Sequence, residues 1–385
     1  MLTSAHRAII KATVPLLETG GEALTTHFYQ KLLADHPEVR PLFNAAHQAS
    51  GEQPRALANG ILMYARHIDQ LEALGPLVGR IVNKHVALQV QPEHYPLVGQ
   101  CLLAAISEVL GAEVATPAVL EAWGAAYGQL AQLLIGAEGE QYQNNASRPG
   151  GWLGARPFRL ARREAESREI TSFYFEPCDG GAVLQALPGQ YLGVRLYIEG
   201  VEHRRNYSLS ALCDGVGYRI SVKRVAQGRV STYLHDQLQV GGTLELLAPA
   251  GDFVLRPGSG PLLLLSAGVG ITPTLPMLEV AAREGREVMF VHCAREPAVQ
   301  GFAGELQALA ARYPNITLRH WYSHANGHVG HTQLAEWLPA AAQVYLLGPS
   351  GFMAAMLNTL GRLGVADGDI HYEFFGPAQA LRGGA

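Results

Sequence analysis

Residues 76–88 read Pro76-Leu-Val-Gly-Arg-Ile-Val-Asn-Lys-His85-Val-Ala-Leu88, and this stretch decides how the chain is interpreted. Steps of four residues back from His85 reach Ile81 and Leu77, so we expect the imidazole on the apolar face of an amphipathic helix. A neutral imidazole in such a place is a natural axial ligand for heme iron. A lone histidine on an apolar face is more often an ordinary core residue, so its surroundings have to decide.

Other residues of the helical first third stand in a recognisable order. They are Phe28-Tyr29, Pro41-Leu-Phe43 and Gln53 upstream of His85, and Tyr95 and Glu138 downstream of it. This order resembles the globin domain of the bacterial and yeast flavohemoglobins. The resemblance implies that His85 is the proximal iron ligand, that Tyr29 and Gln53 face bound oxygen, and that Phe43 packs on the porphyrin.

We expect Tyr95 and Glu138 beside His85, because the second ring nitrogen of a heme-ligating histidine needs an acceptor. The resemblance implies that the two form a proximal network that pushes electron density toward iron. The alternative is that Tyr95 is a surface ring and Glu138 a solvated charge. On the distal side, Tyr29 can donate a hydrogen bond to bound oxygen, and Gln53 and Leu57 shape the pocket. Lys84 completes the predicted heme-binding set.

The composition limits the class of protein. A chain of 385 residues is too long for one ordinary core, so two or three domains are expected. The net charge of -4 and the lack of a Lys/Arg cluster speak against nucleic-acid binding. No apolar run is long enough for a membrane span, and Lys11 and Pro15 argue against a secretory signal, so the cytoplasm is the expected location. The four cysteines lie far apart and predict reduced structural thiols.

The periodicity changes twice along the chain and predicts three domains. Residues 1–146 show helical spacing and predict an all-α globin domain, which ends in the turn-rich stretch Asn144–Gly151. Residues 152–257 contain short strand-like runs and predict an antiparallel β-barrel, which the resemblance implies is the FAD-binding domain. In residues 258–385, apolar strands alternate with helical segments and predict a parallel, doubly wound α/β domain, which the resemblance implies is the NAD(P)H-binding domain.

The barrel segment carries the predicted flavin site. Pro188-Gly-Gln-Tyr191 precedes Arg205-Asn206-Tyr207-Ser208, which we expect to open a strand, and Gly228-Arg-Val230-Ser231 follows. An Arg-x-Tyr-Ser run offers a guanidinium for phosphate, an aromatic ring for a flavin face and a hydroxyl near the reactive ring nitrogen. These motifs resemble the flavin domains of the ferredoxin-reductase superfamily. That resemblance implies that they hold FAD, with Gly228, Val230 and Ser231 at its pyrophosphate.

The run Ser266-Ala-Gly268-Val269-Gly270-Ile271-Thr272-Pro273 predicts the nicotinamide site. Glycines between a strand and a helix let a pyrophosphate approach the backbone, and the helix N-terminus adds free amides. Pro273 replaces the usual last glycine, and proline is tolerated early in a helix. This form resembles the nicotinamide-binding turn of the same superfamily.

The C-terminal segment continues the resemblance. The resemblance implies that the following residues lie near the flavin and its electron path to heme: Glu373, Phe374, Phe375, Gly376 and Pro377. Leu347 stands where many relatives carry a cysteine near the nicotinamide, so we expect reduced efficiency of hydride transfer. Arg295 would meet the 2′-phosphate of NADPH or would be an ordinary solvated arginine, which leaves the choice between NADH and NADPH open.

Two other features of the sequence do not indicate a functional site. His320, His324, His328 and His331 form a histidine-rich stretch, but Asn326-Gly327 breaks it and no cysteine lies nearby, so we do not expect a metal site there. Hydrolase and phosphate-loop motifs are absent from the sequence.

Taken together, the resemblance implies a nitric oxide dioxygenase that uses heme b, FAD and NAD(P)H. Electrons would pass from NAD(P)H through FAD to heme, where oxygen binds and nitric oxide becomes nitrate. The alternatives are a reductase of alkyl or lipid hydroperoxides, and an oxygen- or nitric-oxide-sensing globin. A monomer is expected, and the sequence leaves open whether a lipid occupies the distal pocket.

Overall fold

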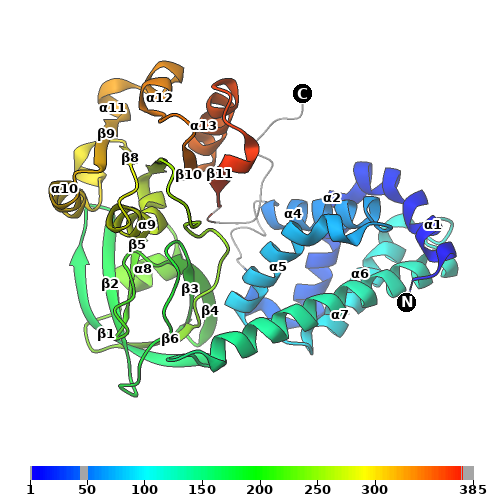
Figure 1. The fold of residues 1–385 in the computed structure, drawn as a ribbon. Helices are drawn as coiled ribbons and strands as arrows, with labels where there is room; N and C mark the ends of the chain where they lie inside the picture. Colours follow the sequence, from blue (N-terminus) through cyan, green and yellow to red (C-terminus); the bar gives the residue numbers. More distant parts are fainter. Residues whose placement is uncertain (1, 44–50, 374, 376–385) are drawn as a thin grey trace. The chain divides into compact units, whose positions relative to one another are not determined.

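The computed structural model describes residues 2–43, 51–373 and 375, and it divides into two compact units (Figure 1). Residues up to 146 form most of the first unit, and residues from 147 onward form most of the second. Within the described residues, no helix combines the length and apolar composition needed to cross a bilayer.

The first unit is helical, as its sequence periodicity predicts. Prolines stand in the first turn of several helices, where their missing amide costs little. A buried core around Phe28, Leu32, Ala105 and Ala126 joins the helices. The helices are α1 (Ser4–Ala12), α2 (Val14–Asp35), η1 (Pro37–Leu42), α4 (Glu52–Arg66), η2 (Leu71–Leu74), α5 (Gly75–Leu88), α6 (His94–Leu110) and α7 (Pro117–Ser147).

The secondary structure at the end of the first unit differs from the prediction. The stretch from Asn144 was expected to be a turn, but α7 continues through Ser147. The side chain of Asn145 is buried, so packing holds this polar segment in the helix. The chain turns only at Gly150, where φ is +74° and a Cβ would lie 2.5 Å from the backbone carbonyl of Val183.

The second unit begins with a six-stranded sheet in the order β4-β3-β6-β1-β2-β5. Strand pairs β1–β2, β1–β6, β2–β5 and β3–β6 are antiparallel, and the curled sheet encloses a core around Phe158, Phe173, Leu192 and Ile220. Strands β2, β3, β5 and β6 match strand-like runs of the sequence at residues 170–175, 190–197, 218–223 and 243–247. The elements are β1 (Ala155–Ala165), β2 (Ile170–Pro177), β3 (Tyr191–Ile198), β4 (Val201–Ser208), β5 (Tyr218–Lys223), α8 (Arg229–Asp236) and β6 (Thr243–Leu247).

The run from Arg205 to Ser208 closes strand β4 instead of opening a strand, which corrects the sequence prediction. Strands β3 and β4 are joined by Glu199 and Gly200, both with positive φ (53° and 76°). Two such residues make the tight turn of a β-hairpin, so the new strand begins directly at Val201. Glutamate is an uncommon residue in this conformation, so residues 199–200 carry no clear turn signal.

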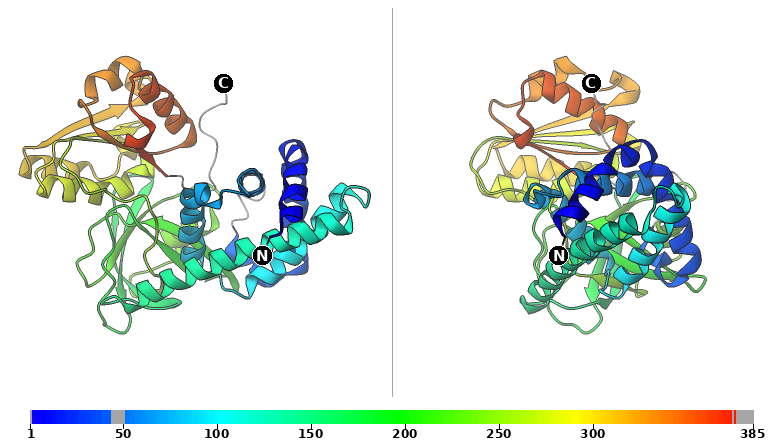
Figure 2. Two further views of the ribbon diagram at one scale, coloured as in Figure 1. Left: turned by 45° about the vertical axis from the view of Figure 1, so that its right-hand side comes forward. Right: turned by 90° about the vertical axis from the view of Figure 1, so that its right-hand side faces the viewer.

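The remaining part of the second unit is a five-stranded sheet in the order β11-β10-β7-β8-β9, with all its strand pairs parallel. Helices α9 and α10 pack on one face and α12 and α13 on the other, which gives two separate cores (Figures 1 and 2). The strands are β7 (Leu262–Ala267), β8 (Val288–Ala294), β9 (Ile316–Tyr322), β10 (Gln343–Leu347) and β11 (Ile370–Tyr372). The helices are η3 (Gly268–Gly270), α9 (Ile271–Arg283), η4 (Pro297–Val299), α10 (Ala303–Arg312), α11 (Ser323–Asn326), α12 (His331–Trp337), α13 (Ser350–Arg362) and η5 (Asp367–Asp369).

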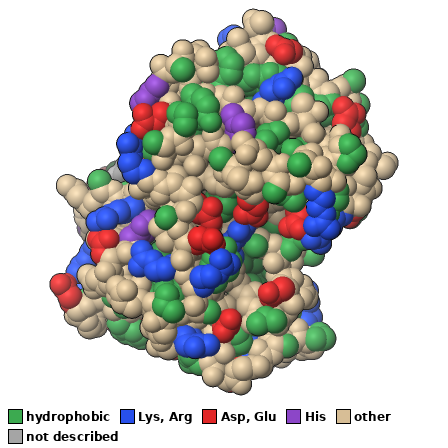
Figure 3. Space-filling view, turned by 90° about the vertical axis from the view of Figure 1, so that its left-hand side faces the viewer, with side chains coloured by type: hydrophobic (Ala, Val, Ile, Leu, Met, Phe, Trp, Pro, Cys, Tyr) green, Lys and Arg blue, Asp and Glu red, His purple; other side chains and the backbone are tan. Residues whose placement is uncertain are grey.

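The histidine-rich stretch is spread over several elements. His320 lies on β9, His324 in the short helix α11, and His331 at the start of α12. Among the described residues, no group of three or more His, Cys, Asp or Glu side chains is placed to hold a metal ion. On the face drawn in Figure 3, basic and acidic side chains are interspersed.

Candidate functional site

Helices α5, α6 and α7 bring His85, Tyr95 and Glu138 together in the first unit. The Nδ1 atom of His85 lies 2.7 Å from Oε1 of Glu138 and 3.1 Å from the hydroxyl of Tyr95. The Tyr95 hydroxyl also donates to the same Glu138 oxygen at 2.6 Å. The Glu138 side chain is 3% exposed and Tyr95 is 7% exposed. Both alternatives raised from the sequence, a solvated glutamate and a surface tyrosine, are therefore wrong.

This arrangement fixes the orientation of the histidine ring. A carboxylate can only accept hydrogen bonds, so a proton between the two groups makes Nδ1 the donor and leaves the lone pair of Nε2 as the one that could bind a metal. The ring is 31% exposed, whereas its partner is buried. Burial, followed by the hydrogen bond to Glu138, raises the pKa of Tyr95, which therefore remains a donor.

Two more tyrosines of α7 brace this site and were not singled out from sequence. The Tyr127 hydroxyl donates to the carbonyl of Tyr95 at 2.6 Å, and the Tyr142 hydroxyl donates to the carbonyl of Val90 at 2.8 Å. Val90 lies in the segment between α5 and α6, and Tyr95 lies in the first turn of α6. Tyr142 could have been found from the sequence, because it lies one helical turn after Glu138. Tyr127 has no such signal.

The predicted distal residues also meet. Tyr29 on α2 is 8% exposed, and its ring contacts that of Phe43 edge-on with 5.6 Å between centroids. Gln53, in the first turn of α4, hydrogen-bonds the Tyr29 hydroxyl, and this contact opposes the rise in the Tyr29 pKa that burial causes. Leu57 lies one turn further along α4 in the same core cluster.

The first unit therefore fits a heme. It has a histidine whose Nδ1 is engaged by a carboxylate and whose ring is partly exposed. It also has a set of half-buried apolar side chains on the segments and helices around it, namely Phe43, Leu57, Ile61, Ile81, Leu88 and Val98. Lys84 precedes His85 on α5 and is half-buried.

Strand β4 carries the predicted flavin motif in the second unit. Burial lowers the pKa of Arg205 and raises that of Tyr207, and the two side chains interact electrostatically. Ser208 is buried at the end of the strand, whereas Asn206 is exposed. Tyr191 of β3 pairs with Ala250 across the barrel, and burial raises its pKa, with Glu373 as the next contributor. Glu373 thus lies close to the barrel residue Tyr191.

The Gly228–Ser231 motif starts helix α8. Gly228 is the residue before the helix, and Val230 and Ser231 are buried in its first turn. The Ser231 hydroxyl accepts from the amide of Val225 at 3.2 Å and donates to the carbonyl of Gly228 at 3.1 Å. These bonds fix the loop whose amides would face a pyrophosphate.

The predicted nicotinamide turn lies between β7 and α9. Gly268 has a φ of +55°, and a Cβ on Gly270 would lie 2.3 Å from the carbonyl oxygen of Leu347 at the end of β10. Glycine is therefore required for the close approach of the turn to the neighbouring strand. Val269 is half-buried, and Ile271, Thr272 and Pro273 are buried in the first turn of α9.

The remaining predicted residues have mixed outcomes. Phe374, Gly376 and Pro377 lie outside the described residues, and Phe375 is half-exposed. Leu347 is fully buried. Arg295 is exposed and forms an ion pair with Glu169.

A polar row that the sequence did not reveal crosses the parallel sheet beside this turn. Ser266, His292 and His320 stand in register on β7, β8 and β9, and Ser266 Oγ lies 2.9 Å from His292 Nδ1. Burial, with His320 contributing, lowers the pKa of His292 to about 3, so its ring is neutral at neutral pH.

Comparison with known proteins agrees with this arrangement. Residues 26–134 match the Globin family, residues 157–255 the Oxidoreductase FAD-binding domain family, and residues 264–358 the Oxidoreductase NAD-binding domain family. The chain is 62% identical to a flavohemoprotein of Pseudomonas putida and 59% identical to one of Pseudomonas aeruginosa. Both alignments cover 99% of this chain and all of the relative.

Solved structures agree as well. A flavohemoglobin from Malassezia yamatoensis with bound FAD and heme covers 97% of this chain, and all of its own, at 30% identity and a TM-score of 0.87. The FAD/NAD-binding domain of a nitric oxide dioxygenase from Vibrio cholerae covers 60% of this chain, and all of its own, at 38% identity and a TM-score of 0.53. The cofactors of the chain are heme, FAD and NAD(P)H, and its globin domain binds oxygen. The protein is an NAD(P)H-dependent oxidoreductase that belongs to the flavohemoprotein family.

Proposed function

We propose that this flavohemoprotein is a nitric oxide dioxygenase. One NAD(P)H, two molecules of oxygen and two of nitric oxide would give two nitrates, NAD(P)⁺ and one proton. The observation that carries the proposal is the pairing of a carboxylate-bound proximal histidine, His85 with Glu138, with a buried distal tyrosine, Tyr29. The proposed functional segments are residues 1–146, 152–257 and 258–385.

Bound heme supplies the iron that holds oxygen, and FAD takes a hydride from NAD(P)H and passes on single electrons. On the proximal side, the Glu138 carboxylate accepts the Nδ1 proton of His85 in a hydrogen bond, which makes the ring a stronger electron donor. The Tyr95 hydroxyl donates to the same carboxylate oxygen and holds it in place.

On the distal side, Tyr29 would donate a hydrogen bond to an electron-rich oxygen. Its raised pKa keeps the hydroxyl protonated, and Gln53 holds the hydroxyl in position. A donor fixed in a buried site stabilises developing negative charge more strongly than water does, because it needs no reorganisation. Tyr29, held by Gln53, would therefore favour reaction of this oxygen with nitric oxide over its release as superoxide.

The test follows nitrate and NAD(P)H together. Purified protein with heme and FAD bound is mixed with NADH or NADPH in aerobic buffer, and nitric oxide is then added. We expect about two nitrates for each NAD(P)H consumed, from the stoichiometry above. Heme and flavin without nitrate formation would contradict the proposal, and faster turnover with an alkyl hydroperoxide would favour the peroxide-reducing alternative.

A pair of variants isolates the distal tyrosine. Tyr29→Phe removes the hydroxyl, and we expect nitrate formation to fall by at least tenfold, as for loss of one fixed donor. The control is Tyr64→Phe, because Tyr64 is also a buried tyrosine of the globin unit, but its hydroxyl donates to the carbonyl of Ala126. Tyr64→Phe should lose some stability and keep the rate of nitrate formation. Equal rates for the two variants would remove Tyr29 from the proposal.

A further inference from the structure

Arg219 is a charged side chain in the buried part of strand β5. Its strand β5 is buried from Tyr218 through Val222, and Arg219 is 8% exposed. Burying a charge is costly unless it is paired and hydrogen-bonded. The hydrogen bonds and the ion pair of this guanidinium therefore indicate which parts of the structure the buried charge holds together.

On the barrel side, Arg219 is bound to the segment that follows the flavin motif. Its Nε donates to the Ser210 hydroxyl at 3.1 Å, and its Nη2 donates to the Ser210 carbonyl. The backbones of the two residues are also joined, since the Ser210 amide donates to the Arg219 carbonyl at 3.0 Å. Ser210 stands only two residues after Ser208, so the guanidinium is fixed directly to the flavin-binding segment.

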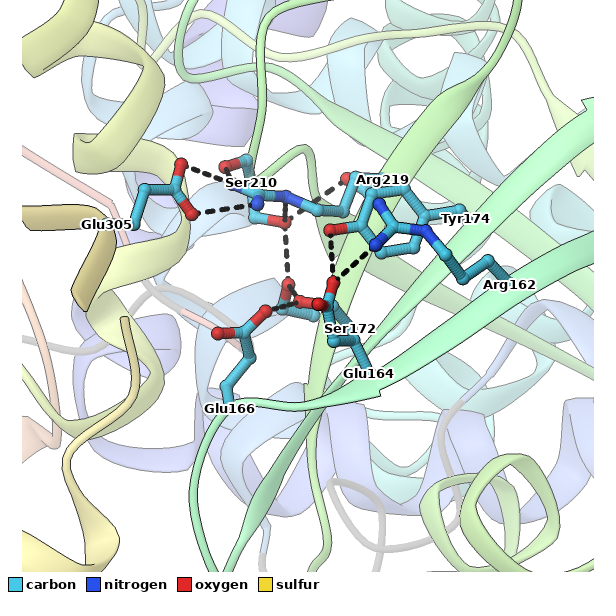
Figure 4. Close-up of polar contacts among 9 residues, drawn as sticks. Arg162, Glu164, Glu166, Ser172, Tyr174, Ser210, Arg219 and Glu305 are labelled. Atoms are coloured by element: carbon cyan, nitrogen blue, oxygen red, sulfur yellow. Dashed lines mark hydrogen bonds and ion pairs between the residues drawn. The ribbon is translucent and has the colours of Figure 1, made fainter. Parts of the chain in front are cut away.

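A chain of hydroxyls holds Ser210 in turn. Its Oγ lies 2.6 Å from that of Ser221 on β5, which lies 2.7 Å from that of Ser172 on β2. The Ser172 hydroxyl donates to Glu166 at 2.6 Å. Figure 4 shows this chain running from the guanidinium across two strands of the barrel. Ser210, which binds Arg219, is therefore itself held by side chains of the sheet.

On the other side, the guanidinium forms a two-point ion pair with the nicotinamide domain. Nη1 and Nη2 of Arg219 lie 2.8 and 3.0 Å from the two carboxylate oxygens of Glu305, in the first turn of α10 (Figure 4). The ring of Phe302, the residue before α10, lies 5.3 Å from the guanidinium carbon. A bidentate pair with an aromatic contact fixes direction as well as distance.

The same strand also lies against the nicotinamide-binding turn. Residues of η3 and β5 approach within 8 Å between Cα atoms. Strand β5 thus contacts the turn at one place and is locked to α10 by Arg219 at another. Two separate contacts between a barrel strand and the nicotinamide domain, one at η3 and one at α10, restrict rotation of one domain on the other.

We propose that Arg219 and Glu305 are positioning residues for flavin reduction, which hold the nicotinamide domain in the orientation that hydride transfer requires. The hydride leaves the nicotinamide ring with its electron pair and reduces the flavin, and neither side chain takes part in bond making. Transfer requires the reacting atoms at roughly 3–3.5 Å, and a displacement of about 1 Å can cost up to about a hundredfold in rate. The inference rests on the shared reductase chemistry and is independent of nitric oxide as the substrate.

The test uses the full-length protein with heme and FAD bound. Flavin reduction by NADH is followed in anaerobic stopped-flow experiments for Glu305→Gln, Arg219→Lys and the double variant. The limiting rate at saturating NADH is separated from the NADH dissociation constant, and FAD content is measured for each variant. Reduction by dithionite, which needs no nicotinamide orientation, serves as a second readout.

The chain offers a matched control on the same pair of domains. Arg168, next to β2 of the barrel, and Glu296, between β8 and α10, form an ion pair at 2.6 Å, but these side chains are 63% and 36% exposed. Exposed pairs contribute little to geometry or stability. Glu296→Gln should therefore keep the limiting rate within about twofold of the unchanged protein.

We expect Glu305→Gln and Arg219→Lys each to lower the limiting rate at least tenfold, with FAD content and dithionite reduction unchanged. The double variant should be no more than about twofold slower than the slower single variant, because either change breaks the same contact. Rates within twofold of the unchanged protein would overturn the proposal. A slow rate that follows loss of FAD, or an equal loss in Glu296→Gln, would overturn it as well, since the pair would then act only on stability.

Discussion

Glu138 shows how one buried carboxylate can orient a histidine and a tyrosine. Its single oxygen Oε1 accepts from both His85 Nδ1 and the Tyr95 hydroxyl, 53 and 43 residues away in the sequence. Because the side chain is almost completely buried, water cannot replace either donor. The charge of this carboxylate, and not only its shape, should therefore set the electron donation from His85.

Glu138→Gln tests whether the charge of this carboxylate sets the electron donation from His85. The amide keeps the size of the side chain and can still accept a hydrogen bond, but it carries no negative charge. We expect nitrate formation to fall by about tenfold and the iron–histidine stretching band to move to lower frequency. Glu140→Gln is the matched control, because Glu140 lies two residues further along α7 and is exposed. A band unchanged in Glu138→Gln would show that the carboxylate does not tune the histidine.

Helix α6 illustrates how an element makes room for the site. A Cβ at Gly99 would lie 2.6 Å from the ring of Tyr127, whose hydroxyl reaches the carbonyl of Tyr95. The missing side chain lets α7 lay this ring across α6. The glycine weakens the helix slightly and improves the packing between the helices.

Gly99→Ala should therefore destabilise the globin unit although alanine is the better helix former. We expect a loss of about 1–3 kcal/mol in the free energy of unfolding, as for overpacking of a core. In Gly128→Ala, a Cβ would meet nothing within 4 Å, so we expect a gain of up to about 1 kcal/mol. Denaturant unfolding followed by loss of heme absorbance checks both values. If the two variants had equal stability, the packing argument would be wrong.

At the scale of the whole molecule, each unit has cores of its own. Buried residues of the globin unit surround Phe28 and Leu32, whereas the second unit has one core inside the barrel and one on each face of the parallel sheet. A change at the heme ligand should therefore leave the reductase domains folded and active.

His85→Ala separates the two functions. We expect loss of bound heme and of nitrate formation, whereas reduction of FAD and of an added acceptor such as ferricyanide by NAD(P)H stays within about twofold, because the reductase cores are independent. His67→Ala, which changes another half-buried histidine of the globin unit, should retain heme. Normally ligated heme in His85→Ala would rule out this residue as the iron ligand.

The order of elements and most of the site follow from local sequence. The mainly apolar stretches at β7, β8 and β10 are typical of buried strands, and the spacing around His85 predicts helix α5. Strand β1 escaped the prediction because arginines at 156, 159, 162 and 163 interrupt its apolar pattern. Strand β9 was not predicted because Arg319 is exposed and the three residues after it, His320 to Tyr322, are only half-buried.

The sequence by itself determined the helical, barrel and α/β order of the chain, and it pointed to His85, Tyr29, the Arg205–Ser208 motif and the glycine-rich turn. Only the tertiary structure decided that Glu199 turns the β3–β4 hairpin, and that Arg219 meets Glu305 across 86 residues. The physical reason is one of range. Helical and strand periodicity is set by neighbouring residues, whereas the partner of a buried charge is chosen only when distant segments pack together.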